Sequence, residues 1–338
     1  MSKKRYLGLI IILTSVTVGG FFYFQHKVYF SHGTDKTIIT FEIKKGQGNA
    51  AIAENLQEKG IIAHKFYFYY YVYSNKLTNK IMPGIYLLGG NLTIPEVAHI
   101  ITNPEAQALK ITFPEGLTAK EMAEVLKKNG FDGDEFWRLT NNIPDSFRKR
   151  YAFLTDSKVH SLEGYLFPDT YFFKRDLTAE QIVQKMLNNF ENKLDEVLWA
   201  EIKKQNKNLA DVIILASIVE KEVPSENDMK IVAGIFENRL ELNMPLQSDA
   251  TLSYLFEDKI DSHTIEQTKI VSPYNTYSNK GLPPGPIANP GMQAILAVIN
   301  PQKTAYNFFL TAKEGNEKKV YYAKTYEEHL FNKQKAKL

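Results

Sequence analysis

The first half of the chain carries an alternation of apolar and polar residues that is followed by a helical pattern. The residues around Phe41 and Ile43 alternate, a glycine follows at Gly46, and apolar side chains then recur at i, i+1 and i+4 up to Gly60. Alternation is typical of a half-buried strand, the second spacing indicates an amphipathic helix, and a glycine commonly ends a helix. The pattern therefore predicts a strand, a turn and a helix.

This unit occurs twice. Adding 70 to Phe41, Ile43, Gly46, Ile52, Ala53, Leu56, Gly60 and Phe66 gives Ile111, Phe113, Gly116, Met122, Ala123, Leu126, Gly130 and Phe136. The first copy continues through an aromatic helix at 66–73 into a strand at 84–88. The order strand, helix, helix, strand resembles a LysM-type glycan-binding domain. The aromatic side chains suit either core packing or stacking on a sugar.

The later half of the unit is duplicated with a larger offset. Adding 85 to Tyr86, Leu87, Leu88, Leu92, Thr93, Val97 and Ile101 gives Tyr171, Phe172, Phe173, Leu177, Thr178, Ile182 and Met186. Offsets of 85 and 70 leave 15 extra residues in the second copy, and we place most of them before Tyr171. Segment 161–170 is therefore a candidate site loop that contains Glu163 and Tyr165, or a turn built on Pro168 and Asp169.

An uncharged run of eight residues, Val212 to Val219, ends at Glu220. As a helix it is apolar nearly all round, which is typical of a buried helix. Burial raises a carboxyl pKa and lets a glutamate donate a proton near neutral pH. Glu220 is thus a candidate general acid, or it begins the solvated end of a core helix. Glu222 follows apolar residues too, about 200° around the helix, so spacing alone does not choose between them.

Polar and proline-rich segments follow this helix. Ser248 or Asp249 is placed to cap a further helix, a role that needs no catalysis. Segment 281–291 holds four prolines and three glycines, which makes a stiff, extended loop. Tyrosine and asparagine side chains near it suit hydrogen bonding and stacking on a sugar, and a purely structural loop is the alternative.

The N-terminus predicts a membrane anchor. Residues 6–24 carry no charge over 19 positions and follow Lys3, Lys4 and Arg5. As a helix this stretch spans about 28 Å, close to the hydrocarbon thickness of a bilayer. The basic residues place the N-terminus in the cytoplasm and the rest of the chain outside. A cleaved signal peptide is the alternative, but no small-x-small cleavage site follows.

Composition excludes several classes of function. The 338 residues carry 41 basic and 38 acidic side chains, and this balance, without a long basic stripe, argues against nucleic-acid binding. Zero cysteines exclude disulfides and thiolate chemistry. The seven histidines are scattered without a helical metal-ligand spacing, so we predict no metal and no cofactor.

Several segments together resemble the endolytic murein transglycosylase family, the MltG or YceG-like proteins. They are Leu162–Tyr171, Leu215–Glu222, Asn238–Leu240, Met244–Thr251, Tyr274–Tyr277 and Gly281–Gly291. The similarity runs from the N-terminal stretch to about residue 330. Ala250 stands where the family usually has proline, and the strand from Lys318 lacks the usual Gly-His entry.

The resemblance implies a lytic transglycosylase with Glu220 as its catalytic residue. Such an enzyme cleaves the bond between N-acetylmuramic acid and N-acetylglucosamine without water and leaves a 1,6-anhydro end, which would terminate glycan elongation. It also implies peptidoglycan strands as substrate, the cytoplasmic membrane as location and peptidoglycan synthases as neighbours. The residues expected to bind the glycan are Glu163, Tyr165, Gln247, Ser248, Asp249, Tyr274, Asn275, Tyr277 and Asn289.

The predicted architecture is α+β. It comprises a cytoplasmic tail and transmembrane helix at 1–25, a linker at 26–36, a LysM-like βααβ domain at 37–105 and a catalytic domain at 106–338, in which 106–190 holds the second repeat. Two alternatives stay open. One is a hydrolytic muramidase that uses Glu163 or Asp249 as a second carboxylate. The other is a membrane-tethered glycan-binding protein without activity.

Overall fold

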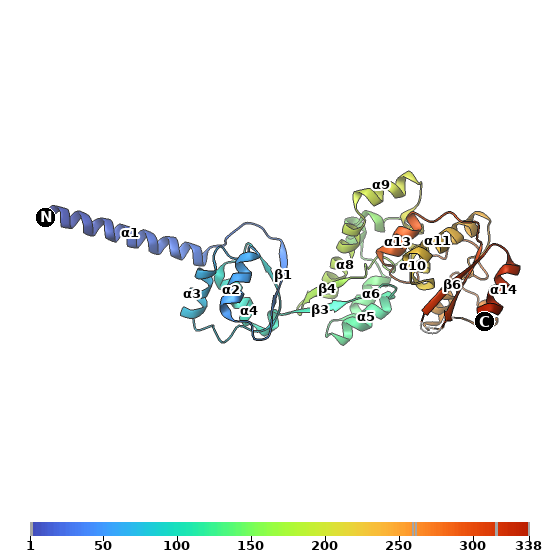
Figure 1. The fold of residues 1–338 in the computed structure, drawn as a ribbon, viewed down its shortest axis with the longest axis horizontal. Helices are drawn as coiled ribbons and strands as arrows, with labels where there is room; N and C mark the ends of the chain where they lie inside the picture. The colour runs from blue at the N-terminus through green and yellow to red at the C-terminus, as the bar shows by residue number, and fades with distance from the viewer. Residues whose placement is uncertain (1–2, 259, 261, 315–316, 337–338) are drawn as a thin grey trace. The chain divides into compact units, whose positions relative to one another are not determined.

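The computed structural model describes residues 3–258, 260, 262–314 and 317–336. It is an α+β fold (Figure 1), as predicted. The strands within the described ranges form three two-stranded sheets, β1 with β2, β3 with β4 and β5 with β6. The strands are β1 (Ile38–Ile43), β2 (Gly84–Gly89), β3 (Ala108–Thr112), β4 (Thr170–Lys174), β5 (Phe308–Glu314) and β6 (Glu317–Ala323).

Helices make up most of the remaining ordered chain. The α-helices are α1 (Lys3–Tyr29), α2 (Asn49–Glu58), α3 (Lys65–Ser74), α4 (Ile94–Thr102), α5 (Ala119–Lys128), α6 (Gly133–Asn141), α7 (Asp145–Arg150), α8 (Ala179–Lys193), α9 (Glu196–Lys204), α10 (Leu209–Glu222), α11 (Glu226–Glu241), α12 (Asp249–Phe256), α13 (Met292–Ile299) and α14 (Tyr326–Ala336). Short 3-10 helices lie at Pro104–Ala106, Ala152–Leu154 and Gln267–Lys269.

The chain forms two compact units. The first is Met1–Ile111 with Tyr171–Asp176, and the second is Thr112–Thr170 with Leu177–Leu338. The sequence placed the division between residues 105 and 106, whereas the structure divides the chain after Ile111 and assigns a returning segment to the first unit.

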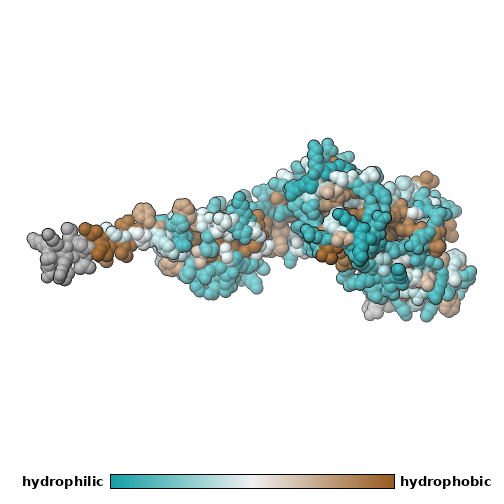
Figure 2. All heavy atoms as spheres, turned by 90° about the horizontal axis from the view of Figure 1, so that it is seen from above, coloured by the Kyte–Doolittle hydropathy of each residue, from teal (hydrophilic) through white to brown (hydrophobic). Residues whose placement is uncertain are grey.

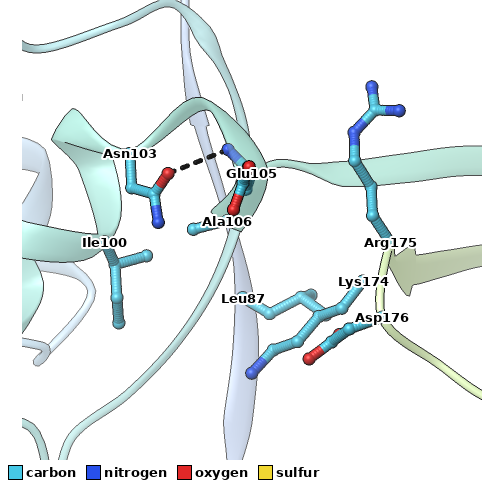
Figure 3. A pocket seen from close by; sticks show the side chains of 8 residues that line it. All are labelled: Leu87, Ile100, Asn103, Glu105, Ala106, Lys174, Arg175 and Asp176. Carbon is cyan, nitrogen blue, oxygen red and sulfur yellow. Dashed lines mark hydrogen bonds between the residues drawn. The ribbon is translucent and has the colours of Figure 1, made fainter.

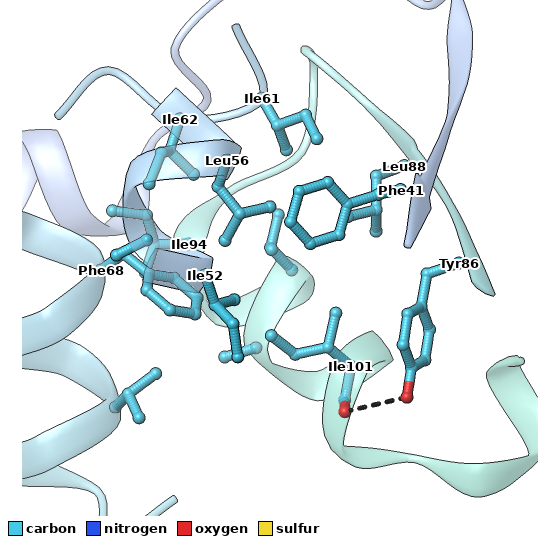
Figure 4. Packing of buried hydrophobic residues seen from close by; sticks show 14 of the residues in the cluster. Phe41, Ile52, Leu56, Ile61, Ile62, Phe68, Tyr86, Leu88, Ile94 and Ile101 are labelled. Carbon is cyan, nitrogen blue, oxygen red and sulfur yellow. Dashed lines mark hydrogen bonds between the residues drawn. The ribbon is translucent and has the colours of Figure 1, made fainter. Parts of the chain in front are cut away.

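The first unit has the predicted order strand, helix, helix, strand. β1 and β2 pair antiparallel, with Phe41 opposite Tyr86. Both side chains are buried in the core drawn in Figure 4, together with Leu56 and Phe68 from α2 and α3. The Tyr86 hydroxyl donates to the carbonyl of Ile101 at the end of α4. The alternation seen in the sequence thus supplies the buried face of this small sheet.

The aromatic helix α3 divides its side chains between core and surface. Phe68 and Val72 are buried, whereas Tyr69 and Tyr73 are exposed. The ring of Phe24 in α1 makes an edge contact with Tyr70, at 4.8 Å between centroids. Core packing is therefore confirmed for the buried side chains of this helix, and stacking of the exposed rings on a sugar stays a prediction.

Helix α1 covers the stretch for which the sequence predicts a membrane anchor. Its apolar side chains from Ile10 to Tyr23 are largely exposed, and many appear as the brown stretch beside the grey atoms in Figure 2. Within the described part of the chain, no helix combines the length and the apolarity needed to cross a membrane.

The duplicated pattern corresponds to duplicated elements. An offset of 70 carries α2 onto α5 residue for residue, and an offset of 85 carries the start of α4 onto the start of α8. Helix α7 and the 3-10 helix Ala152–Leu154 lie in the stretch where the second copy is longer. The loop that follows them, up to β4, brings Glu163 into the second unit.

Candidate functional site

Helix α10 carries the central residue of the site. Asn208 caps its first turn, and every side chain from Val212 to Val219 is buried. In the second unit it packs against α11 and α13. These neighbours bury apolar side chains on several faces of the helix, which explains why its sequence is apolar nearly all round. Glu220 lies where this burial ends and is itself half-buried. The uncharged run thus leads to a carboxyl group at the edge of the core.

The Glu220 carboxyl has one defined hydrogen bond. Its Oε2 accepts the backbone N–H of Gly291 at 2.9 Å. Burial raises the pKa of Glu220, the Gly291 hydrogen bond opposes this, the nearby Glu115 carboxylate adds to it and Lys221 opposes it. Oε1 is left to carry a proton, because Oε2 already accepts a donor. The group therefore meets the chemical requirement of a general acid.

A glycine turn brings the segment before α5 against the end of α10. Gly116 has a φ of +75°, in the left-handed region that favours glycine. A Cβ atom there would lie 3.5 Å from Cγ of Glu220 and 3.4 Å from Cδ of Lys221. Lys221 Nζ donates to the Gly116 carbonyl at 3.2 Å. This turn places the neighbouring Glu115 beside the catalytic candidate.

Asn289 joins the site loop to the proline-rich segment. Its side-chain Oδ1 accepts the backbone N–H groups of Gly164 at 2.9 Å and Leu166 at 3.0 Å. Its Nδ2 donates to Glu163 Oε1 at 2.8 Å. The side chain has no exposed surface. Asn289 therefore acts as a clamp inside the site rather than as an open contact for a ligand.

The backbone of Asn289 extends the same clamp to the turn before α5. Its N–H donates to Leu117 O at 2.9 Å, and its carbonyl accepts the N–H of Gly116 at 2.9 Å. Two residues further on, Gly291 donates to Glu220. The turn, the proline-rich segment and the end of α10 are thus connected by consecutive hydrogen bonds.

Glu163 lies beneath this clamp with only 4% of its surface exposed. Both carboxyl oxygens accept the backbone N–H of Ala119, the first residue of α5, at 2.9 and 3.1 Å. Burial raises the pKa of Glu163 to about 8, although the hydrogen bonds from Ala119 and Asn289 favour the charged form. Glu163 therefore contacts backbone and a clamp residue, not solvent.

A second polar cluster forms two residues beyond Glu220. The carboxyl of Glu222 accepts a short hydrogen bond from the Ser248 hydroxyl, and the Ser248 N–H donates to Thr276 Oγ1 at 3.0 Å. Burial raises the pKa of Glu222 to about 7, and the Ser248 bond opposes the shift. This cluster ties α10 to the segment that starts α12.

The remaining predicted residues around α12 differ in exposure. Asp249 Oδ1 accepts the N–H of His263 at 3.1 Å, and Asp249 is also hydrogen-bonded to Tyr277. Gln247 has a left-handed backbone with φ of 52° and an exposed side chain. Gln247 is thus free to meet a ligand, whereas Asp249 is held within the protein.

Three more predicted residues lie in different surroundings. Asn275 is fully buried; its Nδ2 donates to the carbonyls of Thr268 and Ile270, which folds the loop on itself. Tyr274 is half-buried. Tyr165 is buried at 2% exposure in an aromatic cluster of the core.

The structure thus groups the predicted residues into two networks. Glu220, Glu163 and Asn289 belong to one through Gly291 and the turn at Gly116, and Ser248 belongs to the Glu222 cluster. Two groups in the first network were not predicted from the sequence, the carboxyl of Glu115 and the N–H of Gly291. Gly116 was visible only as a repeat position, and an acid directly before a turn glycine was the one signal for Glu115.

A separate hollow of about 520 Å³ lies in the first unit (Figure 3). Its lining includes Asn103, Glu105, Lys174 and Arg175, and the Arg175 side chain points away from the others. None of the predicted site residues lines it. No cluster of histidine and acidic side chains that could hold a metal ion occurs in the described ranges.

Comparison with known proteins gives the family. An endolytic murein transglycosylase of Bacillus subtilis (strain 168) is 34% identical over 315 residues, which cover 89% of this chain and 85% of that protein. A protein of the same name from Streptococcus pneumoniae R6 is 28% identical over 97% of this chain, which spans only 64% of that relative's length.

A crystal structure of a YceG-like protein from Listeria monocytogenes aligns with a TM-score of 0.62 and 31% identity, covering 88% of this chain and 99% of that one. The model of the YceG-like family matches residues 41–335. The family model leaves out only the first 40 residues and the last three. The chain belongs to the YceG-like family.

Proposed function

We propose that this protein is an endolytic lytic transglycosylase that cleaves peptidoglycan glycan strands. Its relatives in Bacillus subtilis and Streptococcus pneumoniae are named endolytic murein transglycosylases. The observation that carries the proposal is the half-buried Glu220 with its raised pKa, held by the N–H of Gly291 at the edge of the core. A single such carboxyl serves a lytic transglycosylase, whereas hydrolysis of a glycoside normally needs two.

Glu220 performs both proton transfers in this mechanism. The proton on Oε1 passes to the oxygen that links the muramoyl C1 to the next sugar, and the C1–O bond breaks. The resulting carboxylate then takes the proton of the muramoyl 6-hydroxyl as O6 bonds to C1. The product is a 1,6-anhydro sugar, and Glu220 is protonated again. The attack is intramolecular, so the enzyme gains from positioning a hydroxyl that the substrate already carries.

The proposed glycan contacts are those predicted side chains that keep exposed surface. We propose Gln247, Tyr274 and Tyr277 as contacts with the sugar, because each retains accessible surface. Asn275 and Asn289 hold the loops on which such contacts depend, since their amides bond to the protein itself.

Replacing Glu220 by glutamine tests the catalytic assignment. Mass analysis of digested peptidoglycan should show anhydro-muramoyl ends with the wild type and loss of at least about a hundredfold in cleavage with Glu220→Gln. Glu226→Gln removes an exposed carboxyl on α11 and should cleave normally. Full activity of Glu220→Gln would refute the assignment.

The same mass analysis separates the hydrolytic alternative. A muramidase adds one water to each product, and a lytic transglycosylase adds none. The second carboxylates considered for hydrolysis are Glu163 and Asp249, and both are engaged by the protein, Glu163 with Ala119 and Asp249 with His263. A catalytically silent binding protein would give no cleaved product at all.

We also propose that the enzyme works at the outer face of the bacterial cytoplasmic membrane. Support comes from the uncharged stretch 6–24 after Lys3, Lys4 and Arg5 and from the exposed apolar side chains of α1. Fractionation of cells that express the full chain, or a chain that starts at residue 30, tests this. Equal amounts of both proteins in the soluble fraction would contradict it.

The first unit is proposed to be a LysM-like glycan-binding module, on the basis of its strand, helix, helix, strand order. Peptidoglycan synthases are the proposed neighbours of the enzyme. Pull-down of residues 30–111 with insoluble peptidoglycan tests the first of these, and crosslinking in cells tests the second. Absence of any glycan retention would exclude a binding role for the module alone.

A further inference from the structure

Glu115 lies against the glycine that holds the catalytic candidate. A Cβ atom built on Gly291 would fall 1.9 Å from Glu115 Oε1 and 2.1 Å from its Cδ. The Glu115 carboxyl therefore packs directly on the Gly291 backbone, in space that no other residue at 291 would leave open. Glu115 itself is exposed, so nothing in the described chain covers its outer side.

The backbone N–H of the same glycine binds Glu220. Its N–H donates to Glu220 Oε2 at 2.9 Å. Two carboxyl groups, one from the segment before α5 and one from α10, thus meet at a single residue. The turn at Gly116 lies close to this point, since a Cβ atom built on Gly116 would be 3.5 Å from Cγ of Glu220.

We infer that Glu115 is a positioning residue for Glu220, and that its negative charge keeps the transferable proton on Glu220 in the resting enzyme. This inference rests on the proposed function and adds a second carboxylate to it. Glu115 takes no proton from the substrate and forms no bond with it. It acts on Glu220 alone.

The physical reason is repulsion between like charges. Ionisation of Glu220 places a second negative charge beside Glu115, which disfavours the charged form. The charged groups that face Glu220 are Glu115 from the segment before α5 and Lys221 from its own helix, and they act in opposite directions on its pKa. Residues 285–291 contribute no titratable side chain.

The same repulsion also favours the second half of the reaction. When Glu220 has released its proton to the leaving oxygen, its carboxylate stands beside Glu115 and is a stronger base for that reason. Removal of the proton from the muramoyl 6-hydroxyl restores the neutral acid as O6 bonds to C1. A lone carboxylate in the same position would be the weaker base.

Glu115→Gln tests the inference, because it removes the charge and keeps the shape. Activity that requires protonated Glu220 is lost as pH rises through the Glu220 pKa. Lowering that pKa moves the loss to lower pH, so kcat/KM of the variant on soluble glycan strands should fall by roughly tenfold at pH 8 and change little at pH 5. Glu124→Gln, an exposed acid on α5 that pairs with Lys127, is the matched control with an unchanged profile.

A direct titration keeps the test independent of activity. Carboxyl ¹³C signals of glutamate-labelled protein, with the Glu220 signal identified from Glu220→Gln, should show a lower Glu220 pKa in Glu115→Gln than in the wild type. Glu115→Asp, which keeps the charge, should restore the profile in part. An unchanged Glu220 titration overturns the inference and leaves the proposed function intact. An active Glu220→Gln overturns the proposed function itself.

Discussion

At the scale of single residues, the site depends on a position without a side chain. Gly291 donates its N–H to Glu220, and the Glu115 carboxyl packs against the Gly291 α-carbon. A methyl group at position 291 would occupy the space that the Glu115 carboxyl takes. The candidate chemistry of Glu220 was visible in the sequence. That of Glu115 was not, nor was the point where the two acids meet, because residues 115, 220 and 291 are far apart in the chain.

Gly291→Ala should therefore damage activity more than stability. The new Cβ would lie 1.9 Å from Glu115 Oε1, so either Glu115 or the Gly291 backbone must move. We expect kcat to fall by roughly tenfold or more, since small displacements of a catalytic group are costly. Gly48→Ala, where a Cβ meets nothing within 4 Å, is the control, and equal kinetics of the two variants would contradict the prediction.

Glu163 predicts a pH dependence of stability. Between its ordinary value of 4.5 and a folded pKa of about 8, the folded protein keeps a proton that the unfolded chain has released. The free energy of unfolding therefore falls as pH rises through this window.

Urea denaturation at pH 5 and pH 8 checks this. In Glu163→Gln the fall should be smaller by roughly 2–4 kcal/mol, while in Glu124→Gln it should match the wild type. If the free energy of unfolding falls by the same amount between pH 5 and pH 8 in wild type and Glu163→Gln, Glu163 is already ionised in the folded protein at pH 5.

At the scale of elements, a buried hydroxyl links α10 to the proline-rich segment. Ser217 Oγ donates to Ile214 O at 2.7 Å and accepts the N–H of Ile287 at 3.0 Å. The only polar side chain in the uncharged run thus fixes the segment that carries Asn289 and Gly291. In the sequence Ser217 was merely an interruption of apolar residues.

Ser217→Ala should destabilise the protein by about 1–3 kcal/mol, because the buried N–H of Ile287 loses its acceptor. Part of the effect should appear in activity, since Gly291 follows on the same segment. Ser74→Ala removes an exposed hydroxyl bonded to Tyr71 O and should change unfolding little. Thermal and urea unfolding measure both variants. If Ser217→Ala loses less stability than Ser74→Ala, the hydroxyl of Ser217 does not stabilise the proline-rich segment.

At the scale of the whole molecule, the boundary between the units passes through paired strands. β3 and β4 form a two-stranded sheet, although about 60 residues separate them in sequence. A fragment of residues 106–338 keeps both strands, whereas a fragment of residues 113–338 keeps only β4.

We expect the longer fragment to be the more soluble and the more stable to urea, because an unpaired strand edge promotes aggregation. Size-exclusion chromatography and urea unfolding of the two fragments, prepared in parallel, provide the measurement. Equal behaviour would mean that pairing of β3 with β4 contributes nothing to the stability of the longer fragment.

The sequence by itself determined the local elements, and the family resemblance singled out Glu220 as the candidate acid. Alternation and helical spacing are set by near neighbours, so the strands around Phe41, the helix ending at Glu220 and the duplicated helices could be read directly. The offset of 70 relates α2 and α5 for the same reason.

Only the tertiary structure decided which residues share the site and which are buried. The family resemblance made Asn275, Asn289 and Tyr165 expected sugar contacts, but burial and hydrogen-bond partners are properties of the packed chain. Glu115 and Gly291 carried no such chemistry in their local pattern. They meet Glu220 because a turn and a proline-rich segment fold across the end of α10, and that long-range arrangement leaves no periodic signal in the sequence.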